Sequence, residues 1–238
     1  MCSACTIFVK AMGDIPQIEV NKEKMLKDYN QVKAYREAAD KGDTQAMNNL
    51  GVCYHTGKGV RENHATAFQW YIKAAELGDT YACYNVAECY YNGDGVEQND
   101  ELACQWYLKA ANKGDMQSQV NLANAYYLGK GIEENHEKAN RWWMEAAWQG
   151  HVQSMKNLGA DYWNGDGLPH DEAEAAFWYE LAANSGDPFS QFCTGWFYLN
   201  GRGVKQDKRL GLKWIHKATA QNFQPAIDFC KENGYSVY

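Results

Sequence analysis

The sequence predicts an all-α protein built from stacked helix pairs, and two observations carry this prediction. Tryptophan, alanine and glycine residues recur every 36 residues along most of the chain, a length typical of one helix-turn-helix unit. Within each interval, apolar residues are spaced three and four apart, as on one face of a helix. The composition agrees, because 238 residues with 45% apolar and 22% charged content can form a sizeable core.

The recurring residues define five full repeats. They are Trp70, Trp106, Trp142, Trp178 and Trp214, the alanine pairs that end at Ala39, Ala75, Ala111, Ala147 and Ala183, and the glycine pairs that begin at Gly57, Gly93, Gly129, Gly165 and Gly201. Residue types that every repeat requires are most simply explained by packing and turn geometry. We therefore expect repeats at 43–78, 79–114, 115–150, 151–186 and 187–222.

Helix starts and stops follow the same interval. A glycine ends each second helix, and in four repeats an aspartate after it can cap the next first helix. His151 stands in place of this aspartate in the fourth repeat, and Thr194 replaces an apolar residue in the fifth. An Asn or Asp precedes each second helix, where its side-chain oxygen can accept the unpaired backbone amides.

The segments outside the repeats predict flanking elements. Residues 21–42 align with a second helix and predict an N-terminal capping helix, while residues 223–238 align with a first helix and predict a C-terminal capping helix and tail. Residues 1–20 lie outside the repeat register and are interpreted as a tail. Twelve helices are expected in total.

The glycine pair between the two helices of each repeat has the form GxG. A phosphate loop needs a following GK[ST], and a calcium loop needs several acidic ligands with a distal Glu; neither follows here. The residue between the glycines changes from Lys58 to Asp94, Lys130, Asp166 and Arg202. We interpret the pair as a tight turn in which glycine allows positive φ.

The stretch "AMNNLGVCYHTGKGVRENHATAFQWYIKAAELG" resembles the Sel-one-like repeat, a relative of the tetratricopeptide repeats. The resemblance covers the chain from about Asn21 onward, with five copies. It implies antiparallel helix pairs stacked into a right-handed α/α superhelix. It also implies a protein that holds other proteins without chemistry of its own.

The search for catalytic and metal-binding patterns predicts no enzyme, no cofactor and no metal. The motifs HExxH, GxSxG, GxxxxGK[ST] and SxxK do not occur. His64 and His136 share one column at the start of second helices, which indicates an exposed turn and not half of a metal site. The eight cysteines show no pairing rhythm, and "CSAC" at Cys2–Cys5 has no second pair nearby to complete a zinc site.

Candidate binding residues are sought where the repeats differ. In related folds the first helix of each pair lines the concave surface, so its varying positions can be shaped by a partner. In the first repeat these positions are Gln45, Asn48, Val52 and His55. The candidates in the later repeats are Tyr81, Tyr84, Glu88, Tyr91, Asn124, Tyr127, Lys156, Trp163, Phe189, Phe192 and Trp196. Large aromatic side chains dominate interface energies.

The sequence therefore predicts a protein-interaction module or adaptor that binds a protein or peptide through an aromatic-rich concave face. The formal charge of −7 argues against nucleic acid as the partner and favours a basic protein by electrostatic steering. Two alternatives stay open: an immunity protein that neutralises a bacterial toxin, and a hydrolase of β-lactam or cell-wall type. No leader and no membrane-inserting stretch is evident, which indicates a cytoplasmic protein.

Overall fold

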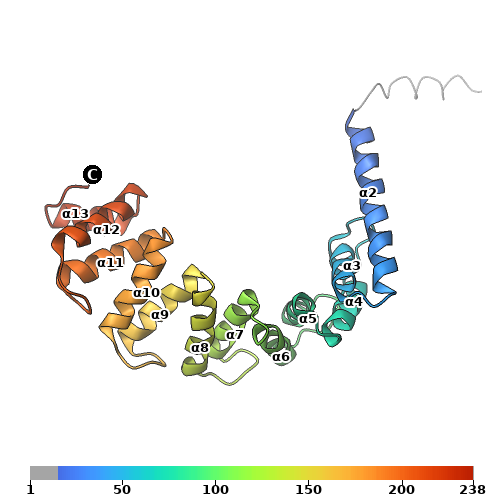
Figure 1. Ribbon diagram of the computed structural model, residues 1–238, viewed down its shortest axis with the longest axis horizontal. Coiled ribbons are helices and arrows are strands. Elements are labelled where there is room, and N and C mark those ends of the chain that lie inside the picture. Colours follow the sequence, from blue (N-terminus) through green and yellow to red (C-terminus); the bar gives the residue numbers. More distant parts are fainter. Residues whose placement is uncertain (1–15, 238) are drawn as a thin grey trace, which may run out of the picture. The chain divides into compact units, whose positions relative to one another are not determined.

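The computed structural model describes residues 16–237, and in this range every regular element is an α-helix (Figure 1). The chain divides into two compact units, one ending at Asn99 and the other beginning at Asp100. We call them unit 1 and unit 2 and describe each by itself. Together they contain twelve helices in the described range, which confirms the predicted all-α solenoid with flanking helices. Cys2 and Cys5 lie outside the described residues.

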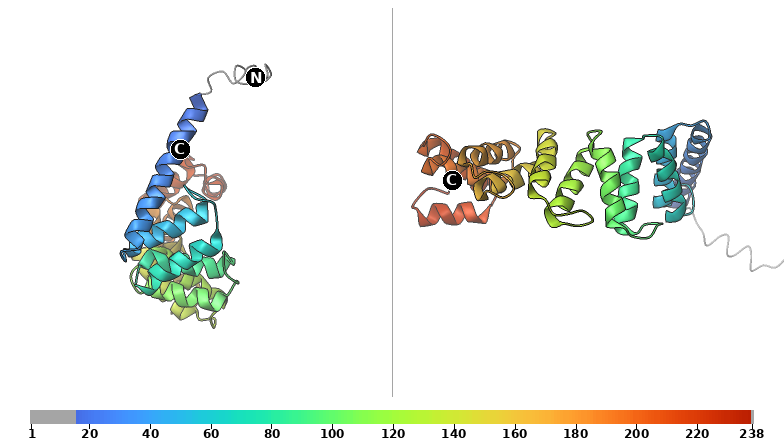
Figure 2. Two further views of the ribbon diagram at one scale, coloured as in Figure 1. Left: turned by 90° about the vertical axis from the view of Figure 1, so that its right-hand side faces the viewer. Right: turned by 90° about the horizontal axis from the view of Figure 1, so that it is seen from below.

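Unit 1 contains the N-terminal helix and the first one and a half repeats. Its helices are α2 (Pro16–Ala39), α3 (Thr44–Thr56), α4 (His64–Glu76) and α5 (Thr80–Asn92). Helix α2 begins within the segment 1–20 that the sequence analysis placed outside the repeat register. Each helix packs against the next one along the chain, as Figures 1 and 2 show.

Unit 2 contains the remaining repeats and the C-terminal helix. Its helices are α6 (Asp100–Ala111), α7 (Met116–Leu128), α8 (His136–Trp148), α9 (Val152–Asn164), α10 (Glu172–Asn184), α11 (Pro188–Asn200), α12 (Lys208–Ala220) and α13 (Gln224–Glu232). Sequential helices again pack against each other, from α6 to α13. The alanine pairs of the second helices are buried at these contacts, because only a small side chain lets two helix backbones approach closely.

Short side chains cap the helix starts as predicted. Asp43, Asp79, Asp115 and Asp187 each accept a hydrogen bond from the backbone N–H three residues on, at 2.7–3.0 Å. In the fourth repeat the Nδ1 atom of His151 takes over this role and accepts from the N–H of Ser154 at 3.2 Å. Burial lowers the pKa of His151, which favours the neutral ring that such an acceptor requires.

The GxG turns hold neighbouring helix pairs close together. The first glycine ends the first helix with positive φ, as at Gly201 (φ 64°). In the second to fifth repeats the second glycine lies against the backbone at the start of the second helix of the preceding repeat, whereas Gly59 of the first repeat lies against Asp28 in the middle of α2. A Cβ atom at Gly203 would lie only 2.1 Å from the carbonyl oxygen of Glu172. Glycine is therefore required here by the close approach as well as by its backbone conformation.

The residue between the two glycines forms an ion pair with the residue whose backbone the second glycine approaches. We call the set of five pairs the ion-pair ladder. It consists of Asp28–Lys58, His64–Asp94, Asp100–Lys130, His136–Asp166 and Glu172–Arg202. Whenever the residue in the turn changes sign, its partner does so too. The variation within GxG therefore has a structural cause that the sequence analysis did not identify.

Candidate partner-binding surface

The predicted binding residues lie on four first helices. Tyr81, Tyr84, Glu88 and Tyr91 belong to α5 in unit 1, and the remainder lie on α7, α9 and α11 in unit 2. None of them is fully buried. Tyr81 is 66% exposed, and Tyr91, Asn124 and Phe189 are also exposed, whereas the others are half-buried.

Not every position in the same register faces outward. Asn48 is buried, and its side-chain Oδ1 accepts a hydrogen bond from Asn85 at 2.7 Å. Leu199 is buried because it belongs to a core cluster with Ile215 and Ala226. Val120, the equivalent of Asn48 in the third repeat, is buried as well. The prediction that all four positions of each first helix are exposed is therefore wrong for Asn48, Val120 and Leu199.

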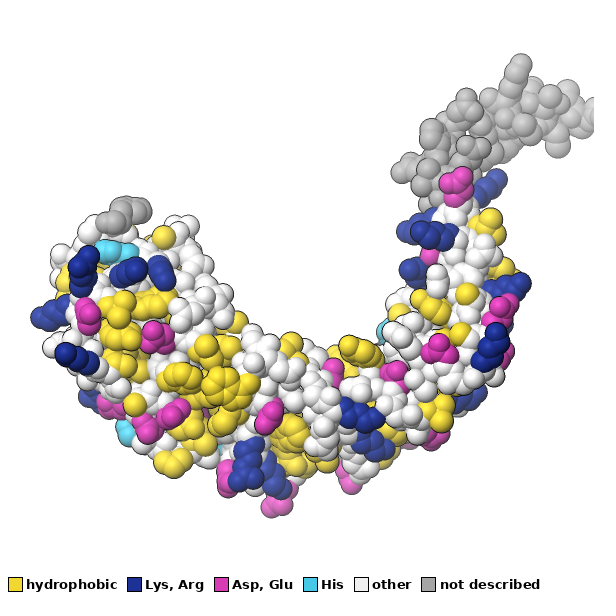
Figure 3. Space-filling model, viewed as in Figure 1, with side chains coloured by type: hydrophobic (Ala, Val, Ile, Leu, Met, Phe, Trp, Pro, Cys, Tyr) yellow, Lys and Arg dark blue, Asp and Glu magenta, His cyan; other side chains and the backbone are white. Residues whose placement is uncertain are grey.

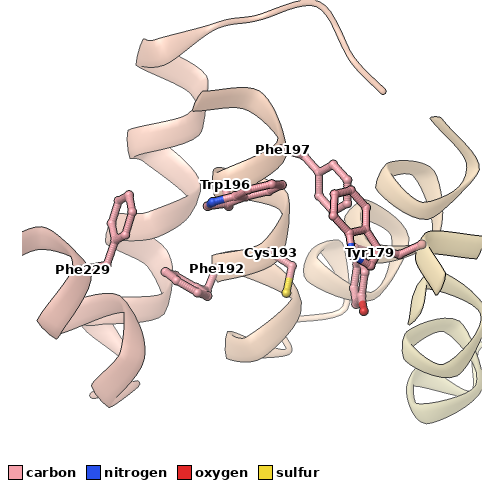
Figure 4. Close-up of a pocket in the computed structure, with 7 residues that line it drawn as sticks. Tyr179, Phe192, Cys193, Trp196, Phe197 and Phe229 are labelled. Atoms are coloured by element: carbon pink, nitrogen blue, oxygen red, sulfur yellow. The ribbon is translucent and has the colours of Figure 1, made fainter. Parts of the chain in front are cut away.

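Three predicted residues meet in one cavity of about 380 Å³ in unit 2, which we call the aromatic pocket. Its lining consists of Trp163, Tyr179, Phe192, Cys193, Trp196, Phe197 and Phe229. Figure 4 shows Phe192 and Phe229 on one side, Tyr179 and Phe197 on the other, and Trp196 and Cys193 between them. In Figure 3, hydrophobic side chains gather over this part of unit 2.

The rings of the aromatic pocket hold one another in place. Trp163 makes edge-to-face contacts with Trp196 and Phe197, at centroid distances of 5.7 and 5.4 Å. Phe192 contacts Phe229 in the same manner at 5.7 Å. Such contacts orient aromatic rings and add to the stabilisation from burial. The pocket is therefore a preformed apolar surface.

The sequence analysis missed four of the lining residues. Cys193 occupies a column that holds asparagine in the other four repeats, and Phe197 follows smaller side chains in its own column. These departures are visible in the sequence, but they lie at inward positions that were treated as scaffold. Tyr179 comes from a second helix, and Phe229 comes from the C-terminal helix outside the repeats.

The charged groups beside the aromatic pocket are already paired. The Lys156 ammonium lies 3.2 Å from Asp187 Oδ2 and 5.3 Å from the ring centre of Phe189. Arg202 pairs with Glu172, and its guanidinium lies 5.5 Å from the Trp163 ring centre. Burial raises the pKa of the Cys193 thiol to about 12, so the thiol is protonated at neutral pH and is a poor nucleophile.

A second cavity of unit 2, about 370 Å³ in volume, has a different chemistry. We call it the acidic pocket, and its lining includes Asn124, Tyr127, Trp143, Asn157, Asp161 and Asp166. Two of these, Asn124 and Tyr127, are predicted binding residues. The Trp143 indole N–H donates to Asn124 Oδ1 at 3.3 Å. The Tyr127 hydroxyl donates to Asp166 Oδ2 at 3.3 Å.

The carboxylates of the acidic pocket differ in environment. Asp166 is paired with His136, and this hydrogen bond is the main cause of the raised pKa of His136. Asp161 is only 6% exposed. Burial, reinforced by the nearby charge of Asp166, raises the pKa of Asp161 to about 7. Asp161 is therefore only partly ionised at neutral pH.

Unit 1 contains a group of side chains that could hold a metal ion. One atom from each of His55, His64 and Asp94 lies within 4.8 Å of the others. The sequence analysis did not predict that these three side chains lie together. The equivalent residues in unit 2 are Tyr127, His136 and Asp166, which repeat the ring contact and the ion pair with a tyrosine in place of His55. The grouping thus follows from the repeat geometry.

Six cysteines lie in the described range, and all are free thiols. Five of them are buried, in agreement with their interpretation as small core residues. No described helix has both the length and the apolar character needed to cross a bilayer. The cytoplasmic location inferred from the sequence stays a prediction.

Comparison with known proteins places this architecture among repeat proteins. The family model of the Sel1 repeat matches residues 44–79, 80–115, 117–151, 152–187 and 188–223. No curated protein matches the chain.

Two solved structures are similar over most of the chain. One is c5321, a protective antigen of uropathogenic Escherichia coli with an SLR fold. It is 33% identical over 84% of this chain, with a TM-score of 0.76, although the match spans 44% of that protein. The other is a Sel1 repeat protein from Oxalobacter formigenes, 26% identical over 86% of this chain and 87% of that one, with a TM-score of 0.72.

An immunity protein, Pa5087 from Pseudomonas aeruginosa, is a more distant match. It is 20% identical over 82% of this chain and 75% of that one, with a TM-score of 0.41. This likeness is too remote to bear on function.

Proposed function

The chain belongs to the Sel1 repeat family, and from this premise we propose that it is a non-catalytic module that binds a protein or peptide partner. Members of the family in general serve as scaffolds for protein–protein interaction. The proposed binding surface consists of the first-helix residues predicted from the sequence. Its centre is the aromatic pocket, which takes an apolar side chain of the partner.

The observation that carries this proposal is the aromatic pocket itself. Seven apolar or aromatic side chains line a cavity of about 380 Å³, and three of them, Trp163, Phe192 and Trp196, are binding residues predicted from the sequence. Pockets that accept an anchor side chain at interfaces are lined in this way, and a few aromatic residues carry most of the binding energy. The protonated Cys193 thiol gives the pocket no nucleophile, which supports binding over chemistry.

The immunity-protein hypothesis is a special case of the same proposal, in which the partner is a toxin. The two forms use the same surface and differ only in the partner that is captured. The hydrolase hypothesis requires a reactive group, and the aromatic pocket offers only the protonated Cys193 thiol. The Asp161 carboxyl group has a pKa of about 7, which would suit a general acid or base, but the lining of the acidic pocket contains no serine or cysteine nucleophile beside it. We therefore retain a binding function as the conclusion.

Partner capture by the full chain tests the proposal. The double variant Phe192→Ala, Trp196→Ala removes two walls of the aromatic pocket. We expect it to bind the captured partner at least about thirtyfold more weakly, since losing interface anchors costs about 2 kcal/mol or more. The affinity is measured by calorimetry with the identified partner.

The control variant is Trp148→Ala. Trp148 is 63% exposed but lies on a second helix, away from the aromatic pocket. It should bind like the wild type. If the double variant has the circular dichroism spectrum of the wild type and keeps full affinity, the aromatic pocket is not the binding site.

A further inference from the structure

The acidic pocket contains a charged residue at a position that is otherwise apolar. Counting in steps of 36, the residues equivalent to Asp161 are Cys53, Cys89, Ala125 and Phe197. A carboxylate in such a column loses its hydration, which is costly unless a partner compensates it. Nothing in the repeat pattern requires this residue, so a local reason must be sought.

Two buried acceptors at this position have no hydrogen-bond partner in the described structure. One is Asp161 Oδ2 and the other is Asn140 Oδ1, and the two side chains interact directly. The Asn140 amide nitrogen donates to the backbone oxygen of Asp166 at 2.9 Å, and the Asn140 side chain also hydrogen-bonds the Asp161 carboxyl group. Buried polar atoms are normally satisfied. Asp161 lines the acidic pocket, so its unpaired oxygen indicates a ligand that brings donors.

The charge around the cavity favours a cation. The groups that face Asp161 from the neighbouring elements are Asp166, His136, Asn140 and the hydroxyl groups of Tyr127 and Tyr179. Glu134 lies 3.2 Å from the other ring nitrogen of His136. Even with Asp161 only partly ionised, the carboxylates of Asp166 and Glu134 outweigh the one imidazolium of His136, so the site has a net negative charge. An arriving cation would reduce the repulsion between Asp161 and Asp166.

The walls of the cavity are suited to an arginine side chain. The rings of Tyr127 and Trp143 lie 5.2 Å apart and give the lining an aromatic part. The side chains of Asn124 and Asn157 add amide oxygens to the polar part. A guanidinium has five donors and no acceptor, pairs with carboxylates and stacks on aromatic rings.

From these contacts we propose that the acidic pocket binds an arginine side chain of the protein partner. The proposal rests on the proposed function, because it assigns a second anchor on the same binding surface. The aromatic pocket then takes an apolar side chain and the acidic pocket takes a basic one. Together they define a partner segment that contains both.

Binding should strengthen as the pH rises. Ionised Asp161 attracts the guanidinium, and deprotonation of His136 removes a competing positive charge. Both changes make the pocket more negative between pH 5.5 and 8. We expect an affinity about tenfold higher at pH 8 than at pH 5.5, while the arginine itself stays charged over this range.

The test is a titration of the ¹⁵N-labelled full chain with N-acetyl-arginine amide, followed by NMR. The reporter is the indole N–H of Trp143, which is assigned from a Trp143→Phe variant. A saturable shift is expected with the arginine probe. The uncharged isostere N-acetyl-citrulline amide should bind at least tenfold more weakly, and the lysine probe should fall between them.

Two variants and one control locate the binding. The substitutions Asp166→Asn and Asp161→Asn should each lower the affinity for the arginine probe about tenfold. The Asp161→Asn variant should remain folded because the substitution removes a buried charge. Asp94→Asn changes the equivalent turn residue of unit 1 and should have no effect. Equal binding of the arginine and citrulline probes, or unchanged binding to Asp166→Asn, would overturn the proposal.

This result can be separated from the test of the proposed function. The Phe192→Ala, Trp196→Ala variant should still bind the arginine probe. If that variant loses the partner but the wild type does not bind the probe, only the arginine site is wrong. If the probe binds as expected and the variant keeps the partner, only the role of the aromatic pocket is wrong.

Discussion

A single aspartate shows how strongly one residue's environment can depart from that of its equivalents. Asp161 sits in a column of small or apolar side chains and is buried beside a second carboxylate. Burial favours its neutral form and raises its pKa to about 7. An ordinary aspartate in the unfolded chain titrates near 3.9. The folded protein therefore binds a proton here that the unfolded chain has already released.

This difference predicts that stability falls as the pH rises. Between about pH 4 and pH 7 the folded state holds more protons than the unfolded chain, so its free energy of unfolding decreases across that window. The full effect is of the order of 4 kcal/mol. Asp161→Asn should abolish most of it. Urea unfolding at pH 5 and pH 8 measures the difference for both proteins.

His136 contributes in the same direction, because its pKa is raised by the bond to Asp166 and its stabilisation is lost as it deprotonates. The contribution of His136 remains in the Asp161→Asn variant and determines how far its free energy of unfolding still depends on pH. An equally steep loss of stability in wild type and variant would show that Asp161 is not buried as described.

The joint between neighbouring helix pairs is the element that distinguishes this fold from a simple row of helices. At each GxG turn, one glycine ends a helix, the next contacts the backbone of the preceding repeat, and the residue between them forms an ion pair with that repeat. Backbone contact and charge pairing thus act at one place. The register between repeats is fixed there.

A glycine substitution at this joint tests the close approach. Gly203→Ala places a Cβ atom 2.1 Å from the Glu172 carbonyl oxygen. We expect a loss of about 3 kcal/mol or more, because the backbone must move in addition to adopting an unfavourable φ. Thermal unfolding followed by circular dichroism gives the value.

Gly186→Ala is the matched control. Its φ of 95° is also positive, but a Cβ atom there meets nothing within 4 Å. It should cost only about 1–2 kcal/mol from backbone strain. If both substitutions cost the same, the contact with Glu172 does not matter.

At the scale of the whole molecule, the sequence predicted the helices well because the same kinds of capping and turn residues recur in every repeat. Caps such as Asp43 and turn glycines such as Gly57 recur at fixed positions, so a single ambiguous residue cannot change the interpretation. The pattern also identified aromatic residues that vary between repeats, among them the half-buried Trp163, Phe192 and Trp196. Three of them form one pocket in the structure.

The rest of the site could not be predicted in that way. The lining residues Tyr179, Phe197 and Phe229 come from inward columns and from a helix outside the repeats. The acidic pocket depends on Asp161 and on its distance from Asp166, and spacing along the sequence does not show which side chains from three helices meet. These contacts depend on packing and not on periodicity.

The alternation of charge along the ion-pair ladder yields a prediction for the whole chain. Deleting residues 151–186 removes one repeat and brings His136 opposite Arg202, two groups of like sign. Arg202→Asp should therefore stabilise the deletion variant, but it should destabilise the full-length protein, where it faces Glu172. Each effect should be about 1 kcal/mol, as for partly exposed pairs.

The comparison requires four proteins, and their melting temperatures at pH 6 provide the readout. The sign of the Arg202→Asp effect should reverse between the two backgrounds. The same sign in both would mean that the pairs of the ion-pair ladder do not contribute to how repeats join.

The ion-pair ladder also determines how many repeats can be added or removed without bringing like charges together. The partner of the turn residue is acidic at Asp28, Asp100 and Glu172, whereas it is a histidine at His64 and His136. Neighbouring repeats therefore carry opposite polarities. Duplication or loss of one repeat would place two groups of like charge at a joint, whereas duplication of two adjacent repeats together would not. The charge pattern of this protein therefore recurs every two structural repeats.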